Sequence, residues 1–280
     1  MRITPGTAVL LMLGPVAFFV LFFVAPFGLL LAESFIRPGG GATLANYTSV
    51  LGDLYYWRAL LNTLLISLWV TVICFLLGYP LAYFIVFRAC RPWQRRLIYV
   101  LLMTPLFTSN IVRAFGWIVI LGRRGIVNAG LLAAGLIDAP LEILYSKLSI
   151  IIGLAYILLP VMALSVCAVL QTVDRALIEA ARDLGARPSH AFLAVTFPLS
   201  LPGVIAGSII VFALSVSAYV IPSILSGGRE MVTPMLIFQQ YTATFRPDIG
   251  ATLSIVLLAV TLLLIGSYLL LFERRLRTAA

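Results

Sequence analysis

Long apolar runs separated by short polar segments are the main pattern of the chain. Six runs stand out, at about residues 7–32, 59–87, 97–121, 148–170, 201–223 and 250–272. An α-helix rises about 1.5 Å per residue, so about 20 apolar residues cross a hydrocarbon layer roughly 30 Å thick. The runs lack the alternation of barrel strands, and backbone groups in lipid must find their partners within a segment. The pattern therefore predicts an all-α integral membrane protein with six transmembrane helices.

Composition and charge narrow the class of protein further. Hydrophobic residues make up 62% of the 280 positions and charged residues 10%, whereas roughly a quarter of the residues in a soluble domain are charged. The net charge of +9 raises the question of nucleic-acid binding. The basic residues form no stripe with interleaved aromatics, however, so nucleic acid is not an expected partner.

The distribution of basic residues predicts the orientation in the lipid bilayer. With a cytoplasmic N-terminus, inner segments hold eleven of the 19 Lys and Arg residues and outer segments hold seven. The inner residues are Arg2, Arg88, Arg91, Arg95, Arg96, Arg175, Arg182, Arg187, Arg274, Arg275 and Arg277. The outer residues are Arg37, Arg58, Arg123, Arg124, Lys147, Arg229 and Arg246. Because cytoplasmic segments carry an excess of Lys and Arg, both termini are predicted to be cytoplasmic.

A charged segment at about residues 173–200 separates the fourth and fifth runs. Asp174 can cap a short helix whose apolar face consists of Leu177, Ala180, Ala181 and Leu184. Gly185 can end this helix with a positive φ, Pro188 suits the first turn of a second helix, and Pro198 is expected to end that second helix. The pattern predicts two short amphipathic helices facing water. A surface helix that merely joins two spans is the alternative.

Arg113 is the one basic residue inside a predicted span. The third run also contains Pro105 and the polar string Thr108–Asn110, so we expect a bent helix. Arg113 lies about 24 Å from Leu97 along an uninterrupted helix, in the outer third of the hydrocarbon layer. It can extend to the outer headgroups, or it can lie on a translocation path or contact a partner helix.

Four further polar residues are weak candidates for a translocation path: Tyr156, Ser215, Ser217 and Tyr219. They lie near the helix-bending residues Pro160 and Pro222. Serines in membrane helices often bond their own backbone, which is the alternative interpretation for both serines.

Several chemistries lack the residues that they need. A phosphate-binding loop requires Lys followed by Ser or Thr, but the only lysine, Lys147, precedes Leu148. The single histidine, His190, excludes paired-histidine metal sites, and the three cysteines have no metal-like spacing. No carboxylate lies well inside a run, which counts against a proton-coupled carrier and an intramembrane hydrolase. The chain is therefore not expected to be an enzyme or to bind a metal or ATP.

The charged segment also carries a recognisable set of residues. Glu179, Ala180, Ala181 and Gly185, followed by Val195–Pro198, resemble the cytoplasmic loop of binding-protein-dependent ABC transporter permeases. Val195 stands where isoleucine is usual, and Phe197 stands where leucine is usual. Further stretches resemble the spermidine/putrescine-type branch of these permeases: Leu61–Thr63, Ile111–Trp117, Gly125–Asn128, Tyr156–Pro160, Ser217–Gly228 and Thr233–Pro234.

This resemblance implies a type I importer fold, with residues 1–280 as a single permease domain in a bacterial inner membrane. It implies that the loop is a coupling loop between helices 4 and 5 that contacts an ATPase. The implied coupling residues are Glu179, Ala180, Ala181, Asp183, Gly185 and Pro198. The implied partners are two ATPase subunits that bind ATP and Mg, a second homologous permease chain forming a heterodimer, and an extracytoplasmic solute-binding protein.

The expected function is an ATP-driven importer subunit that forms part of the path of a small, polyamine-like solute. Alternating access would follow from ATP binding by the partner. An ion-coupled secondary transporter is the alternative, and an intramembrane enzyme is a further one. No residue in the spans identifies the solute.

Overall fold

The computed structural model describes residues 5–36, 40–88 and 91–277, with side chains described between residues 12 and 272. Cys90, Arg2 and Arg37 lie outside the described residues, as do the side chains of Arg274, Arg275 and Arg277. The described chain is helical, and its only extended pairing is an isolated bridge between Ile36 and Ala42. The prediction of an all-α protein is confirmed.

Two compact units divide the chain. The first unit comprises residues 1–59 and 236–260, and the second comprises residues 60–235 and 261–280. The elements that begin in the first unit are α1 (Pro5–Phe19), η1 (Val20–Val24), α2 (Ala25–Ser34), α3 (Ala45–Gly52), α4 (Leu54–Tyr83) and α14 (Pro247–Arg277). Here η denotes a π-helical turn. Helix α4 passes from the first unit into the second, and α14 does the same.

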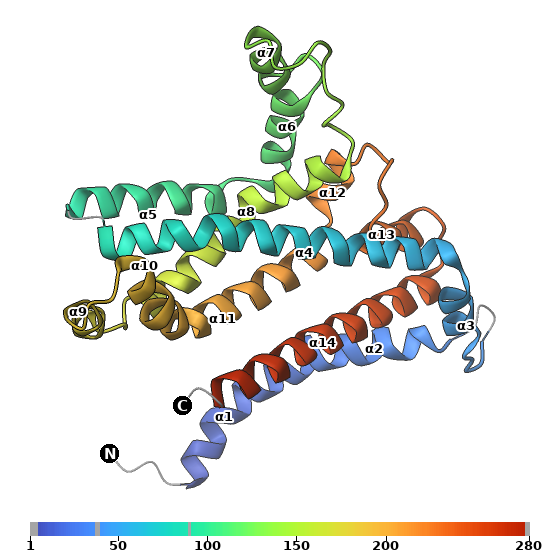
Figure 1. The fold of residues 1–280 in the computed structure, drawn as a ribbon. Coiled ribbons are helices and arrows are strands. Elements are labelled where there is room, and N and C mark those ends of the chain that lie inside the picture. Colours follow the sequence, from blue (N-terminus) through green and yellow to red (C-terminus); the bar gives the residue numbers. More distant parts are fainter. Residues whose placement is uncertain (1–4, 37–39, 89–90, 278–280) are drawn as a thin grey trace. The chain divides into compact units, whose positions relative to one another are not determined.

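The second unit holds most of the buried side chains. Its remaining elements are η2 (Phe84–Arg88), α5 (Pro92–Phe107), α6 (Asn110–Leu121), α7 (Ile126–Ala133), α8 (Lys147–Leu170), α9 (Arg175–Asp183), α10 (Pro188–Ala191), η3 (Phe192–Thr196), α11 (Phe197–Val216) and α12 (Val220–Leu225), and α13 (Thr233–Thr242) begins in it. In Figure 1, α4, α5, α8 and α11 lie alongside one another, whereas α6 points in a different direction.

Buried hydroxyl and amide groups connect the elements of the first unit. The Asn46 amide donates to the carbonyl oxygens of Ser34 and Ile36 at 3.1 and 3.0 Å, which joins α3 to the end of α2. Thr252 of α14 donates to the same Ser34 carbonyl at 3.2 Å. A helix C-terminus leaves carbonyls without intrahelical partners, so these side chains complete the end of α2.

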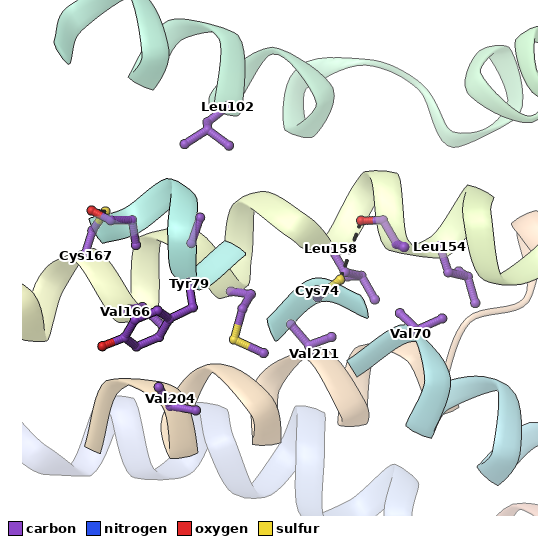
Figure 2. Close-up of a cluster of buried hydrophobic side chains, with 14 of the residues drawn as sticks. Val70, Cys74, Tyr79, Leu102, Leu154, Leu158, Val166, Cys167, Val204 and Val211 are labelled. Carbon is purple, nitrogen blue, oxygen red and sulfur yellow. Dashed lines mark hydrogen bonds between the residues drawn. The ribbon is translucent and has the colours of Figure 1, made fainter. Parts of the chain in front are cut away.

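Helix α8 lies at the centre of the core of the second unit. Met162 and Val166 of α8 pack with Val70 and Cys74 of α4 and with Val211 of α11 in one buried cluster (Figure 2). Small residues let the helices approach closely: a Cβ at Gly203 of α11 would lie 2.9 Å from the Ser165 carbonyl oxygen. A Cβ at Gly78 of α4 would lie 3.0 Å from Met162, as expected where membrane helices meet through small residues.

Six helical stretches are long and apolar enough to cross a membrane, within the described residues. They are Met12–Ser34, Leu54–Arg88, Asn110–Ala133, Lys147–Leu170, Pro188–Val216 and Pro247–Phe272. Five of them match the runs predicted from the sequence at 7–32, 59–87, 148–170, 201–223 and 250–272, whereas Asn110–Ala133 overlaps only part of the run at 97–121.

The third predicted span, at 97–121, is not one helix. Helix α5 ends at Phe107, Thr108 and Ser109 are extended with ψ values of 145° and 135°, and α6 begins at Asn110. The sequence predicts a bend at this point, whereas the structure interrupts the helix completely. The depth of Arg113 therefore does not follow from its distance along one uninterrupted helix.

An asparagine organises the segment that follows α6. The Asn128 side chain is fully buried, donates to the carbonyl oxygens of Gly122 and Leu141 at 3.1 and 3.0 Å, and accepts from the Leu141 amide at 2.8 Å. Gly125 has no room for a side chain, because a Cβ there would lie 2.4 Å from the Ile120 carbonyl oxygen. The Gly125–Asn128 stretch therefore has a structural role in holding this segment closed.

Candidate functional site

The segment between α8 and α11 contains α9, the first of the two short helices that the sequence predicts. Asp174 precedes α9, and its carboxylate accepts a hydrogen bond from the Ala176 amide at 2.9 Å, as an N-cap does. Gly185 follows α9 with φ +85°. Its amide donates to the Arg182 carbonyl at 2.8 Å, and the Ala186 amide donates to the Ala181 carbonyl at 3.1 Å. These two bonds form a Schellman motif, so both predicted ends of this helix are confirmed.

The apolar face of α9 is largely uncovered. Leu177 is 50% exposed and Leu184 is 90% exposed, and Ala180 between them is exposed as well. Ala181 and Ile178 are half-buried and face the rest of the chain. The predicted face of Leu177, Ala180, Ala181 and Leu184 is thus divided, with three of its four residues turned outward. Glu179 and Asp183 are exposed beside that outward surface.

Pro198 does not end the second helix, and that prediction is wrong. Helix α10 passes through η3 into α11, with Pro198 as the second residue of α11. The Phe197 amide donates to the Phe192 carbonyl, a bond that spans five residues instead of four. Proline lacks an N–H and its ring collides with the carbonyl four residues earlier in an α-helix. The wider π-helical turn before Pro198 moves that carbonyl, so the helix continues.

Arg175 joins α9 to η2, which continues α4. Its guanidinium Nη2 donates to the Val86 carbonyl at 3.1 Å and its Cζ atom lies 5.8 Å from the centre of the Phe87 ring. The sequence pattern placed Arg175 on the water-facing side of α9 with Glu179 and Arg182. Nothing in the sequence around Phe87 distinguishes it as the partner of Arg175, so this long-range contact was not predicted.

The candidate path residues do not all come together. Arg113 of α6 lies within electrostatic reach of Tyr156 of α8, and Trp117 packs edge-on against Tyr156 with ring centres 5.7 Å apart. The Arg113 side chain donates to the Ser109 carbonyl and to the Asn110 side chain, while its buried Nη1 has no hydrogen-bond partner. Trp117 and Tyr156 therefore form one aromatic contact between α6 and α8, and Arg113 lies one helical turn before Trp117 on α6.

The remaining candidates lie at the end of α11. Ser215 is buried, and its hydroxyl has no hydrogen-bond partner. Ser217 is exposed and donates to the Leu214 carbonyl at 3.1 Å, which is the backbone bond that the alternative interpretation expects. Tyr219 is half-buried at the N-cap of α12.

A second polar group, which we term the inter-helix polar cluster, was missed from the sequence. It consists of Asn62, Thr63, Lys147, Glu230 and Thr233. Lys147 Nζ donates to Asn62 Oδ1 at 2.8 Å and lies 3.9 Å from Glu230 Oε2. The Thr233 amide donates to the buried Thr63 hydroxyl at 2.8 Å. Asn62 and Thr63 lie within α4, which begins at Leu54, so they do not cap that helix but tie it to α8 and to the start of α13.

The fold and the loop together define a class. A multi-pass helical membrane protein with an uncovered apolar face on a short loop helix is suited to act as the membrane subunit of a larger assembly. Among the described residues, no group of three or more His, Cys, Asp or Glu side chains could hold a metal ion.

Comparison with known proteins identifies the family. Residues 74–278 match the family described as "Binding-protein-dependent transport system inner membrane component". The chain is 34% identical over 255 residues to the spermidine/putrescine transport system permease protein PotB of Haemophilus influenzae, covering 89% of this chain and 88% of that protein. It is also 34% identical to PotB of Escherichia coli over 260 residues, with coverage of 90% and 93%. A bacterial ABC transporter that imports alginate has a chain with the same fold, at TM-score 0.80, 18% identity and 95% coverage of both chains.

The chain therefore belongs to the family of binding-protein-dependent transport system inner membrane components. It is the permease subunit of an ABC importer and not itself an enzyme. It is a multi-pass inner-membrane protein that works with a binding protein and a separate ATPase. The resemblance stated from the sequence is confirmed, and the alternative of an ion-coupled secondary transporter receives no support.

The inter-helix polar cluster generates a stability prediction. Thr63→Val keeps the side-chain shape but leaves the buried Thr233 amide without its acceptor, which costs about 1–3 kcal/mol. We expect the unfolding temperature of the purified protein in detergent, followed by circular dichroism, to fall by several degrees. Thr71→Val on the same helix is the control, because the Thr71 hydroxyl bonds only the Ser67 carbonyl of its own helix at 2.8 Å. Equal unfolding temperatures for the two variants would contradict the assigned role of Thr63.

Proposed function

We propose that this chain forms part of the path of a small, polyamine-like solute, delivered by an extracytoplasmic binding protein and moved at the expense of ATP. Two relatives about one-third identical over some nine-tenths of this chain are spermidine/putrescine permeases. The observation that supports transport driven by an ATPase subunit is the uncovered apolar face of α9. Leucines left exposed on a polar loop are costly in water and indicate a protein partner.

The proposed partner of α9 is an ATPase subunit. Ala180 is small enough for close approach, and Leu177 and Leu184 flank it on the exposed face. Glu179 and Asp183 supply charge at the edge of this surface, and Ala181 seats the helix on its own chain. Gly185 sets the direction in which the chain leaves α9. Pro198 contributes indirectly, because the η3 turn that accommodates it joins the loop to α11.

The full assembly follows from the same proposal. One permease domain over residues 1–280 pairs with a second homologous chain to form a heterodimer, and each chain receives one ATPase subunit through its loop. The two ATPases bind ATP and Mg, and this chain binds no cofactor. Support comes from an alginate importer of the same fold, whose structure was determined in complex with a ligand-bound periplasmic protein.

Both termini are proposed to be cytoplasmic. The arginine-rich inner segments and the polar loop at 173–200 then lie on the side where the ATPase is.

The coupling loop generates the first prediction. Valine at Gly185, where φ is +85°, carries a strain of roughly 1–2 kcal/mol, enough to change a conformational population by about 5- to 30-fold. Glu179→Lys reverses a charge at the proposed contact. We expect both variants to insert normally but to lose roughly fivefold or more of the substrate-stimulated ATP hydrolysis and of the co-purifying ATPase.

Gly135→Val is the matched control for Gly185→Val. Gly135 follows α7 with φ +66° in the same kind of helix end, with its amide bonded to Leu132 and the Leu136 amide bonded to Leu131. If Gly185→Val and Glu179→Lys both keep full stimulation and full co-purification, the loop is not the coupling element.

Arg113 generates the second prediction. If Arg113 lies on the path or in a functional contact, Arg113→Ala should lower solute uptake while the complex still assembles. Arg113→Lys should do the same, because lysine lacks the planar guanidinium that reaches Ser109 and Asn110. A residue that merely extends to headgroups tolerates lysine. Arg123→Ala is the control, since its ion pair with Glu142 at 3.3 Å is highly exposed. Normal uptake of labelled spermidine by both Arg113 variants would remove this residue from the path.

Orientation is tested by thiol labelling. Cys90 lies in a predicted inner segment, whereas Cys74 and Cys167 are buried. A membrane-impermeant maleimide should therefore label the protein in inside-out vesicles, and Cys90→Ser should abolish the labelling. Labelling of Cys90 in right-side-out vesicles would reverse the proposed orientation.

A further inference from the structure

Five aromatic side chains gather where α4 meets the loop and the start of α11. We term them the aromatic cluster: Tyr79, Tyr83, Phe87, Phe192 and Phe197. Phe192 of η3 lies edge-on to Tyr79 and Tyr83 of α4, with ring centres 5.8 and 5.5 Å apart. Phe197 lies 5.7 Å from Tyr79, and Tyr83 lies 5.0 Å from Phe87. The rings form an unbroken chain of contacts from α11 to the end of η2.

A buried hydrogen bond links the same two helices. The Tyr79 hydroxyl lies 2.8 Å from the Ser200 hydroxyl, and Ser200 in turn donates to the Phe197 carbonyl at 2.8 Å. Both side chains are buried, Tyr79 at 6% exposed and Ser200 at 0%. Figure 2 shows Tyr79 of α4 near Val166 of α8 and Val204 of α11, inside the core of the second unit. At this level α4 and α11 are joined by both packing and polar contact.

Arg175 extends this connection to α9. It is the first residue of α9, so its guanidinium joins the start of the loop helix to Val86 and Phe87 at the end of the α4–η2 helix. The last four carbonyls of a helix have no intrahelical partner, and a cation at that end also interacts favourably with the helix dipole. The Val86 carbonyl is therefore a fixed acceptor, and the Phe87 ring is a fixed face for the guanidinium.

We infer that Arg175 is a positioning residue that makes α9 and the cytoplasmic end of α4 move as one body. This inference rests on the proposed docking of an ATPase on α9. Helix α9 is already continuous in sequence with α8 and, through α10 and η3, leads into α11. Arg175 adds a hydrogen bond and a ring contact from α9 to η2, the continuation of α4, so a displacement of the loop also carries α4.

Distance measurement between spin labels tests this body directly. We place nitroxide labels on Arg182→Cys of α9 and Leu77→Cys of α4, both exposed, in a Cys90→Ser background where the remaining native cysteines are buried. The assembled complex is measured without nucleotide and after trapping with ATP and vanadate. We expect the same narrow distance distribution in both states. With Arg175→Ala, we expect the trapped state to show a shifted or broadened distribution.

Conservative variants separate positioning from simple stability. Arg175→Lys keeps the charge but cannot both stack on Phe87 and reach Val86, so it should behave like Arg175→Ala. Phe87→Leu keeps an apolar side chain and should show a weaker form of the same defect. The double variant Arg175→Ala/Phe87→Leu should be no worse than Arg175→Ala alone, because both substitutions act through the contact between Arg175 and Phe87. Arg96→Ala on α5 is the matched control, because Arg96 is also an exposed arginine in a segment predicted to be cytoplasmic.

ATP hydrolysis supplies the second readout. Coupling between distant sites is typically 5- to 150-fold, so loss of this link should remove roughly fivefold or more of the stimulation by the binding protein. Unstimulated hydrolysis and co-purification of the ATPase should stay within about twofold of the parent complex.

Three results would overturn the inference: a label distance that changes on trapping in the parent complex, unchanged distances in both Arg175 variants, or loss of the ATPase from those variants. Failure of the parent complex to bind an ATPase at all would instead reject the proposed function.

Discussion

Close packing of α8 against its neighbours is the constraint on which the second unit depends. Lipid tails are as apolar as leucine, so membrane helices gain little from the hydrophobic effect and associate through tight van der Waals contact. Gly203 of α11 has no room for an additional carbon atom, and at Gly78 of α4 such an atom would be in tight contact with Met162 at 3.0 Å. The places of α4 and α11 beside α8 set the positions of the aromatic cluster, of Arg175 and of the loop helix.

Two prolines show how a helix in this chain continues through a residue that ordinarily interrupts it. The π-helical turn η1 ends at Val24, two residues before Pro26, and η3 ends at Thr196, two residues before Pro198. In both turns the residue just before the proline donates its amide to a carbonyl five residues back. The widened turn removes the collision at the proline and keeps the amide just before it bonded within the segment, as a lipid environment requires. At Pro198 this joins a loop element rigidly to a span.

Local features of the candidate site were predictable from the sequence, whereas contacts between distant segments were not. The Asp174 cap and the positive φ of Gly185 depend on residues within one helical turn, and both predictions are confirmed. The end assigned to Pro198 was wrong because the π-helical turn that accommodates it has no signature of its own. The contacts of Arg175 with Phe87 and of Thr63 with Thr233 join residues about 90 and 170 positions apart, and residue spacing carries no information on such pairs.

The continuity of α10, η3 and α11 has a geometric consequence. The helical stretch Pro188–Val216 contains 29 residues, which at about 1.5 Å each corresponds to a rod of roughly 44 Å. A rigid rotation of about 10° around one end of such a rod displaces the other end by roughly 8 Å, more than the pitch of a helical turn. A slight angular change at one end of this arm therefore becomes a displacement as large as a small solute at the other end.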